Sequence, residues 1–135
     1  MEKLTTDRTI RVIVCDPGKE AEEKYIENTL QTMQNICGGP IEAVYPEFNS
    51  NVVLIVNEEG KIRGLDLNRS LTDEDGTILD VIAGTFIITG TDFDTCEFGS
   101  LTDAETKKYM ERFRWSEAFF TTSGRIWSRE VRANV

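Results

Sequence analysis

Residues 52–57 carry the sequence VVLIVN, and this stretch decides how the rest of the chain is interpreted. The run is almost continuously apolar and rich in β-branched residues, which favours a strand. A strand without polar alternation is typical of the centre of a sheet, where both faces are covered. We therefore expect a β-sheet with residues 52–57 at its centre.

Further short strands are expected on both sides of this central strand. They share β-branched or apolar runs bounded by turn residues, and they are residues 9–15, 41–45, 62–67, 78–83 and 85–89. Residues 58–61, Glu-Glu-Gly-Lys, predict a hairpin turn that leads into residues 62–67. Gly84 predicts a bulge, a bend or a point where something approaches the backbone closely.

Two helices are expected. The first covers residues 19–37 and ends at Gly38, which suits the left-handed position after a helix. Its apolar residues recur at helical spacing: Ile26, Leu30, Met33 and Cys37. The second covers residues 103–113, because Thr102 and Glu105 form the pattern of a capping box.

Helices that interrupt mostly hairpin-linked strands indicate the α+β class. We expect a mixed or mostly antiparallel curled sheet with two helices packed on it. Residues 1–135 are interpreted as a single domain, with a core over residues 10–113. Residues 114–135 form a C-terminal extension that is rich in aromatic residues and arginine, and a turn at Thr122-Ser123-Gly124 predicts that it is a terminal hairpin.

The net charge of −9 favours an acidic, soluble protein and argues against direct contact with nucleic acid or an anionic membrane. The chain opens on polar residues and has no apolar run of the length that a membrane span needs, so we expect a cytoplasmic location. Cys15 and Cys37 lie in apolar or helical patterns and are predicted to be buried thiols.

The chain contains no histidine. This excludes Ser-His-Asp and Cys-His catalysis in their usual forms, and it excludes histidine-ligated metal sites. No catalytic residue, metal or cofactor is predicted.

Asn68, Arg69 and Asp80 are the candidate binding residues. An arginine offers a planar fork that suits carboxylate or phosphate, and asparagine supplies both a donor and an acceptor. The alternative is a structural role, in which Arg69 forms a salt bridge with Asp66 or Asp80 and the asparagine forms a turn.

The extension supplies a second candidate surface. Its arginines are Arg114, Arg125, Arg129 and Arg132, and its acidic residues are Glu117 and Glu130, so it carries +2 and the remaining residues carry −11. Trp115, Arg125, Trp127 and Arg129 combine the residue types that dominate protein interfaces. A hairpin that only closes the sheet is the alternative.

Two other functions depend on carboxylates. A histidine-free hydrolase would use Asp92, Asp94 or Glu97, provided that two of them share a cleft. A DNA-mimicking counter-defence inhibitor would need one continuous acidic face formed by that loop and the glutamates of the first helix, namely Glu20, Glu22, Glu23 and Glu27.

Several motifs together resemble a known family. They are DPGK after the first strand, GGPIEAVY, the stretch VNEEGKIRGLDLNRSL, the segment DVIAGTFIITG, and SLTD before the closing helix. The pattern over residues 10–113 resembles a bacterial and phage family known as domain of unknown function 3846. The resemblance implies no activity, and it implies a setting among the accessory genes of mobile elements.

The sequence thus favours a non-enzymatic accessory protein of mobile-element or phage origin that binds a small molecule or a protein not specified by any motif. The extension makes a homo-oligomer a further hypothesis.

Overall fold

A computed structural model describes residues 8–48, 50–92, 94–95 and 97–132. The main sheet has six strands in the order β2-β1-β7-β4-β3, with β8 paired to β7. Its strands are β1 (Thr9–Cys15), β2 (Glu22–Glu27), β3 (Ile41–Val44), β4 (Val52–Asn57), β7 (Phe86–Thr91) and β8 (Phe98–Gly99). All pairings in this sheet are antiparallel, so the predicted α+β class with mostly antiparallel strands is confirmed.

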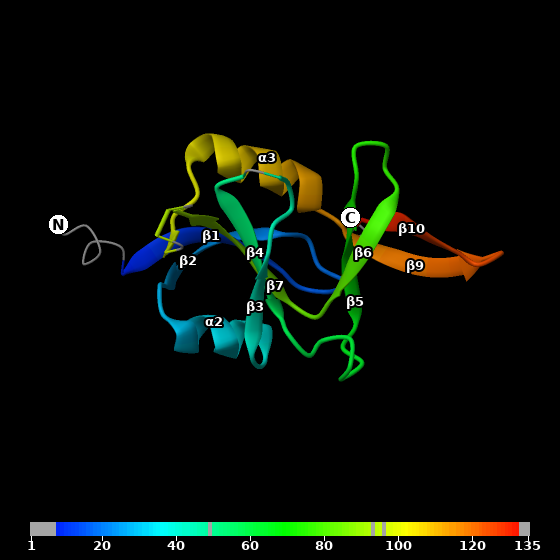
Figure 1. The fold of residues 1–135 in the computed structure, drawn as a ribbon, viewed down its shortest axis with the longest axis horizontal. Helices are drawn as coiled ribbons and strands as arrows, with labels where there is room; N and C mark the ends of the chain where they lie inside the picture. The colour runs from blue at the N-terminus through cyan, green and yellow to red at the C-terminus, as the bar shows by residue number, and fades with distance from the viewer. Residues whose placement is uncertain (1–7, 49, 93, 96, 133–135) are drawn as a thin grey trace.

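Two hairpins lie outside the ladder of the main sheet. One joins β5 (Leu67–Thr72) to β6 (Ile78–Ala83), and the other joins β9 (Ser116–Thr122) to β10 (Arg125–Val131). β5 contacts β9, so the two hairpins lie side by side at one end of the molecule (Figure 1). The terminal hairpin predicted for the extension is therefore present.

The two helices lie on opposite sides of the main sheet, α2 (Leu30–Cys37) below and α3 (Asp103–Phe113) above in the view of Figure 1. Alternate strand residues face each helix, because successive side chains of a strand point to opposite faces. Ile13, Leu54, Phe86 and Ile88 pack with Tyr109 and Phe113 of α3. Ile10, Val12, Val53 and Ile87 pack with Met33 and Cys37 of α2. β4 is buried along its whole length, which confirms the prediction of a central strand.

The helix predicted over residues 19–37 is wrong in its first half. Residues 22–27 form the edge strand β2, which pairs antiparallel with β1 from Thr9↔Glu27 to Val14↔Glu22. The helix begins only after Thr29, whose side chain accepts a hydrogen bond from the backbone N–H of Thr32. Pairing with β1 satisfies the backbone of residues 22–27, and this tertiary contact overrides the helical spacing of the sequence.

The strand predicted over residues 62–67 is also wrong. Residues 58–64 form a series of turns in which Ile62 is exposed, and β5 begins only at Leu67. β4 pairs with β3 and β7 instead of forming a hairpin with the next segment. The glycine at position 60 indicated a turn correctly, but the turn is longer than a hairpin loop.

The capping signals of the sequence are confirmed. Thr102 and Glu105 form the reciprocal capping box of α3, which covers the predicted residues 103–113. Gly38 ends α2 with φ = 82° and donates its N–H to Gln34. At Gly84, φ is +89° and an added Cβ would lie 2.8 Å from Leu65, so a close approach occurs there as predicted. α3 is the longest described helix, and none of the described helices is long and apolar enough to cross a membrane.

Gly60→Ala should destabilise the fold by about 1–3 kcal/mol, the usual cost of forcing extra atoms into a packed site. A Cβ at this position would lie 2.5 Å from the carbonyl oxygen of Ala83. Urea denaturation measures the loss. Gly99→Ala is the matched control, because its Cβ would meet nothing within 4 Å, and it should change stability by less than about 0.5 kcal/mol. Equal effects of the two substitutions would contradict the close approach.

Candidate functional site

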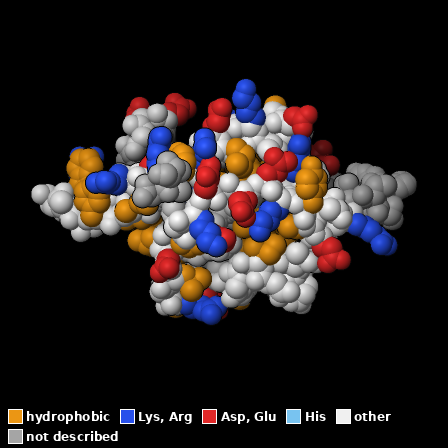
Figure 2. All heavy atoms as spheres, turned by 180° about the vertical axis from the view of Figure 1, so that it is seen from behind, with side chains coloured by type: hydrophobic (Ala, Val, Ile, Leu, Met, Phe, Trp, Pro, Cys, Tyr) orange, Lys and Arg blue, Asp and Glu red, His pale blue; other side chains and the backbone are white. Residues whose placement is uncertain are grey.

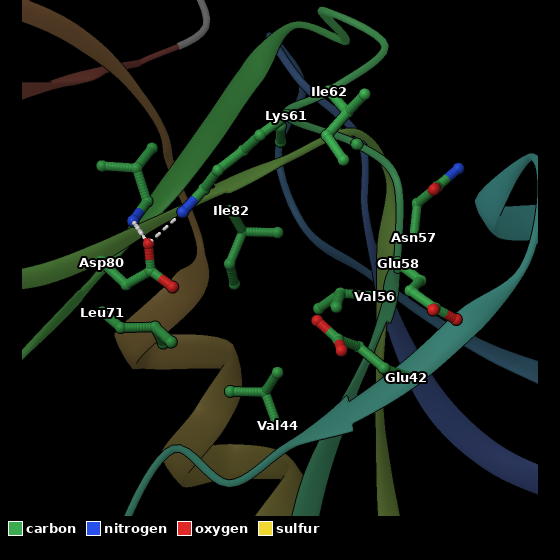
Figure 3. Close-up of a pocket in the computed structure, with 13 residues that line it drawn as sticks. Glu42, Val44, Val56, Asn57, Glu58, Lys61, Ile62, Leu71, Asp80 and Ile82 are labelled. Atoms are coloured by element: carbon green, nitrogen blue, oxygen red, sulfur yellow. Dashed lines mark hydrogen bonds and ion pairs between the residues drawn. The ribbon is translucent and has the colours of Figure 1, made fainter.

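A pocket of about 260 Å³ lies between β3 and the β5–β6 hairpin (Figure 3). Its walls come from β3, β4, the turns after β4, β5 and β6. Val44, Val56, Leu71 and Ile82 point toward one another from these four strands and form an apolar floor. The pocket therefore brings together segments that are far apart in the sequence.

The rim of the pocket is charged. Glu42, Glu58 and Asp80 supply three carboxylates, and Lys61 supplies one ammonium group. Lys61 forms an ion pair with Asp80, whose carboxylate also accepts a 2.8 Å hydrogen bond from the N–H of Val81 (Figure 3). Burial acts to raise the pKa of Asp80, but these hydrogen bonds outweigh burial and lower it, so Asp80 is ionised at neutral pH.

The turns after β4 form a fixed wall of the pocket. Asn57 is buried, donates to the carbonyl of Cys37 at 2.9 Å and accepts from the N–H of Glu59 at 2.7 Å. Gly60 receives the N–H of Leu65 on its carbonyl at 2.9 Å, which closes the turn. These bonds tie the wall both to the end of α2 and to β4.

Arg69 is placed inside the protein, with 0% of its surface exposed. Its five N–H groups donate to the carbonyl oxygens of Asp16, Lys19, Phe113 and Arg114 and to the side-chain oxygen of Asn68, at 2.6–3.0 Å. Phe113 and Arg114 are the last residue and the C-cap of α3, where helix carbonyls lack intrahelical partners and carry partial negative charge. The guanidinium thus caps the C-terminal end of α3.

Asn68 is also fully buried and extends the same network. Its side-chain amide donates to the carbonyls of Cys15 at 2.9 Å and Gly84 at 2.8 Å. Together with Arg69 it links β5 to the end of β1, to the loop that follows β1, and to α3. Burial lowers the pKa of Arg69, although an arginine side chain stays protonated in a protein.

The structure does not bring the three candidate binding residues to one surface. Asp80 lies on the half-exposed rim of the pocket, whereas Asn68 and Arg69 lie in the interior and donate to main-chain oxygens. The structural alternative considered for Arg69 named Asp66 or Asp80 as its partner, but its partners are carbonyl groups, and Asp80 pairs with Lys61.

The pocket residues on β3, β4 and the turns were not singled out from the sequence. Val44, Val56 and Ile82 have the apolar character of any strand residue, and only the tertiary structure shows that they share a cavity. Nor does the sequence show that the carboxylates of Glu42 and Glu58 line the same pocket, because the two residues are 16 positions apart along the chain.

Three of the four interface candidates share one face of the C-terminal hairpin. Arg125, Trp127 and Arg129 alternate along β10, and the guanidinium of Arg125 lies 4.5 Å from the Trp127 ring centroid. Trp115 precedes β9, and its ring is approached by Arg114 at 4.7 Å and by Arg132 at 5.1 Å.

The loop carboxylates proposed for a hydrolase are exposed. Asp92 accepts hydrogen bonds from the N–H groups of Asp94 and Thr95, so it stabilises the turn that contains it. Glu97 is also exposed, and its carbonyl accepts from the N–H of Asp92. This loop leads into β8 and lies at the end of the molecule opposite the C-terminal hairpin (Figure 1).

The four glutamates considered for DNA mimicry each interact with a different residue. Glu20 pairs with Arg114, Glu22 with Lys24, and Glu23 with Arg11, while Glu27 accepts from the hydroxyl of Thr32. Glu22 points to the opposite face of β2 from Glu23. Figure 2 shows basic and acidic side chains interleaved on the face that it presents.

The described cysteines, Cys15 and Cys37, are buried, as predicted. Burial raises the pKa of each thiol to about 12, so neither forms the reactive thiolate at neutral pH. Cys96 lies outside the described residues. Within the described part of the chain, no three Cys, Asp or Glu side chains gather in a way that could hold a metal ion.

Comparison with known proteins identifies the family. A family model described as "Domain of unknown function (DUF3846)" matches residues 10–114. The chain belongs to this family. No curated protein and no solved structure matches the chain. The matched region includes the pocket and the buried network of Arg69, and it ends before β9, so the C-terminal hairpin lies outside it.

Arg69→Lys should lower the free energy of unfolding by about 3 kcal/mol or more. Lysine has three donors on one atom and loses at least two of the five bonds, each worth about 1.5 kcal/mol when a charged group donates. Urea denaturation measures the change. Arg63→Lys is the control, because Arg63 is exposed and should shift stability by less than about 0.5 kcal/mol. A change at Arg69 as small as that at Arg63 would contradict the network.

Cys15 and Cys37 should resist iodoacetamide at pH 8 in the folded protein. A pKa near 12 in place of 9.0 leaves about 1,000-fold less thiolate at this pH. Peptide mass spectrometry of native and urea-unfolded samples measures labelling at each position, and the same thiols in urea are the control. Rapid labelling of either thiol in the native state would show that it is accessible and ionised.

Proposed function

We propose that this protein is a non-enzymatic binding module whose pocket between β3 and the β5–β6 hairpin holds a small cationic ligand with an apolar body. The observation that supports the proposal is the combination in one pocket of an apolar floor and a rim with three carboxylates and one ammonium group. Small-molecule sites commonly have this composition, with a mostly apolar lining and a few polar groups that set specificity.

The charge of the rim selects the kind of ligand. Lys61 is engaged by Asp80, which leaves the carboxylates of Glu42 and Glu58 without an ion-pair partner among the residues that the structure describes. An ammonium or guanidinium group near these two carboxylates is therefore attracted, and an anion is repelled. Val44, Val56 and Ile82 would cover an aliphatic or aromatic part of the same ligand.

Binding without turnover fits the protonation states of Asp80 in the pocket and of the buried cysteines elsewhere in the protein. Asp80 has a lowered pKa, so it is a poor proton donor at neutral pH, and the raised pKa values of Cys15 and Cys37 disfavour a thiolate nucleophile. Asn68 and Arg69 act in this proposal by holding the β5–β6 wall in place. An origin in a mobile element or phage is part of the proposal and rests on the family resemblance alone.

A matched series of small probes tests the charge preference. Pentylamine, pentanol and pentanoate have the same carbon chain with a positive, neutral or negative head. Amide NMR spectra should shift saturably with pentylamine around Val44, Leu71 and Ile82, and pentanoate should cause no such shift.

Substitution of the rim carboxylates tests the same claim from the protein side. Glu42→Gln combined with Glu58→Gln should weaken pentylamine binding about tenfold, which corresponds to about 1.4 kcal/mol. Glu111→Gln is the matched control, because Glu111 is an exposed glutamate on α3 outside the pocket. Equal binding of pentylamine and pentanoate, or no effect of the double substitution, would contradict the proposal.

A further inference from the structure

The C-terminal hairpin is a regular ribbon that leaves the body of the molecule (Figure 1). β9 and β10 pair in register from Ser116↔Val131 to Thr122↔Arg125. Ser123 and Gly124 connect them with φ values of 52° and 75°, and positive φ at both central residues is the mark of a type I′ turn. This turn matches the natural twist of a two-stranded ribbon, so the backbone of the turn favours the hairpin.

Beyond its base the hairpin exposes both of its faces. Its side chains from Phe120 to Val131 are exposed except for Ser128, which is half-buried. Large apolar groups are among them: Phe120 is 47% exposed and Trp127 is 39% exposed. A two-stranded hairpin on its own is marginally stable in water, and exposed aromatic residues on such an element indicate a surface that a partner covers.

One face of the hairpin is basic and aromatic. Strand alternation and register place Phe120, Arg125, Trp127 and Arg129 together, and we refer to these four residues as the arginine face. Phe120 and Trp127 are direct cross-strand partners. The two carboxylates of the strands, Glu117 and Glu130, pair with each other on the opposite face. The arginine face therefore attracts an acidic surface that also carries apolar groups.

The same chain carries a surface of that kind. A hollow of about 640 Å³ lies beside the β5–β6 turn, and we refer to Phe48, Asp73, Glu74, Asp75 and Leu79 as the acidic hollow. Phe48 is 99% exposed and Leu79 is 68% exposed, so large apolar side chains stand among the carboxylates. Glu47 and Arg112, which also line the hollow, carry opposite charges, so the three carboxylates of residues 73–75 give it a negative balance.

We propose that the arginine face of one copy docks into the acidic hollow of a second copy of this chain. Each surface supplies the charge and the apolar groups that the other lacks, which is the basis of electrostatic complementarity at interfaces. The β5–β6 turn, which forms part of the acidic hollow, and the C-terminal hairpin lie in the same half of the molecule (Figure 1). In the proposed dimer a two-fold axis relates the two copies, and the arginine face of each copy meets the acidic hollow of the other. Such an exchange closes the assembly as a dimer.

Charge also favours a second copy over a nucleic acid as the partner. The residues outside the extension carry −11, against +2 for the extension itself. A phosphate backbone drawn to the arginine face would meet the field of this acidic body along its length. A second copy also carries −9, but its acidic hollow places three carboxylates beside exposed apolar side chains that Phe120 and Trp127 can contact. The net charge of the extension is thus opposite in sign to the net charge of the remaining residues of another copy.

Sedimentation velocity on the full chain tests the dimer. The wild-type protein should show a concentration-dependent species of twice the 15.3 kDa monomer mass, and 500 mM NaCl should weaken it by screening the ion pairs. A monomer at every concentration up to 1 mM overturns the proposal. So does a wild-type monomer that binds a DNA duplex or single strand through the arginine face, measured by fluorescence anisotropy.

A charge exchange between the two surfaces provides the sharpest test. Variant one carries Arg125→Glu and Arg129→Glu, and variant two carries Glu74→Arg and Asp75→Arg; all four positions are exposed, so both variants should fold, as circular dichroism checks. Each variant alone should dimerise at least tenfold more weakly than the wild type, because like charges then face each other.

Mixing the two variants should restore the dimer. The acidic hairpin of variant one then meets the basic hollow of variant two, and the unchanged arginine face of variant two meets the unchanged acidic hollow of variant one. Recovery of a heterodimer supports both contacts and their two-fold exchange. A mixture that stays monomeric, or a dimer that neither variant weakens, overturns the proposal. These outcomes are independent of the pocket and its ligand.

Discussion

The buried guanidinium of Arg69 is the interaction on which the arrangement of the molecule depends. Neither hairpin shares a ladder with the six-stranded sheet, so strand pairing alone does not hold them in place. Arg69 sits on β5 and donates to carbonyls of the loop after β1 and of the end of α3. A single side chain thus connects the main sheet, the closing helix and the β5–β6 hairpin.

Burial of a positive charge without a direct carboxylate partner is costly unless its hydrogen bonds are satisfied. Here all five N–H groups find acceptors, and some of these acceptors are the carbonyls at the end of α3, where the helix dipole is negative. Asn68 supplies another acceptor while its own amide binds the carbonyls of Cys15 and Gly84. Every side-chain N–H group of the pair thus finds an acceptor, which offsets the cost of burying Asn68 and Arg69.

Both proposed surfaces depend on this network. β5 and β6 form one wall of the pocket, and the turn between them carries the acidic hollow. Arg114, whose carbonyl accepts a hydrogen bond from Arg69, lies two residues before the start of β9. The hydroxyl of Ser70 on β5 donates to Glu117 on β9 at 2.7 Å. The pocket between β3 and the β5–β6 hairpin and the C-terminal hairpin are therefore separate surfaces that share the support of this network, and the C-terminal hairpin lies outside the residues that the family model matches.

Local patterns made much of the fold predictable. The apolar run of β4, the capping box of α3 and the Ser123-Gly124 turn each depend on neighbouring residues, and the structure contains all three elements. β2 was not predicted, because its pairing with β1 is a tertiary contact that the helical spacing of Ile26 and Leu30 conceals. The polar character of Asn68 and Arg69 was evident, but their burial follows from the docking of α3, which the sequence does not display.

The most direct test of the central claim is an NMR measurement of the arginine side chains with ¹⁵N labelling. The Nε–H of Arg69 donates to the carbonyl of Phe113 at 2.8 Å in the interior, so its signal should stay visible near neutral pH and exchange slowly with water. The Nε–H groups of exposed arginines such as Arg125 and Arg129 should be broadened by rapid exchange. Exchange at Arg69 as fast as at these two would contradict the account, because its guanidinium would then be open to solvent.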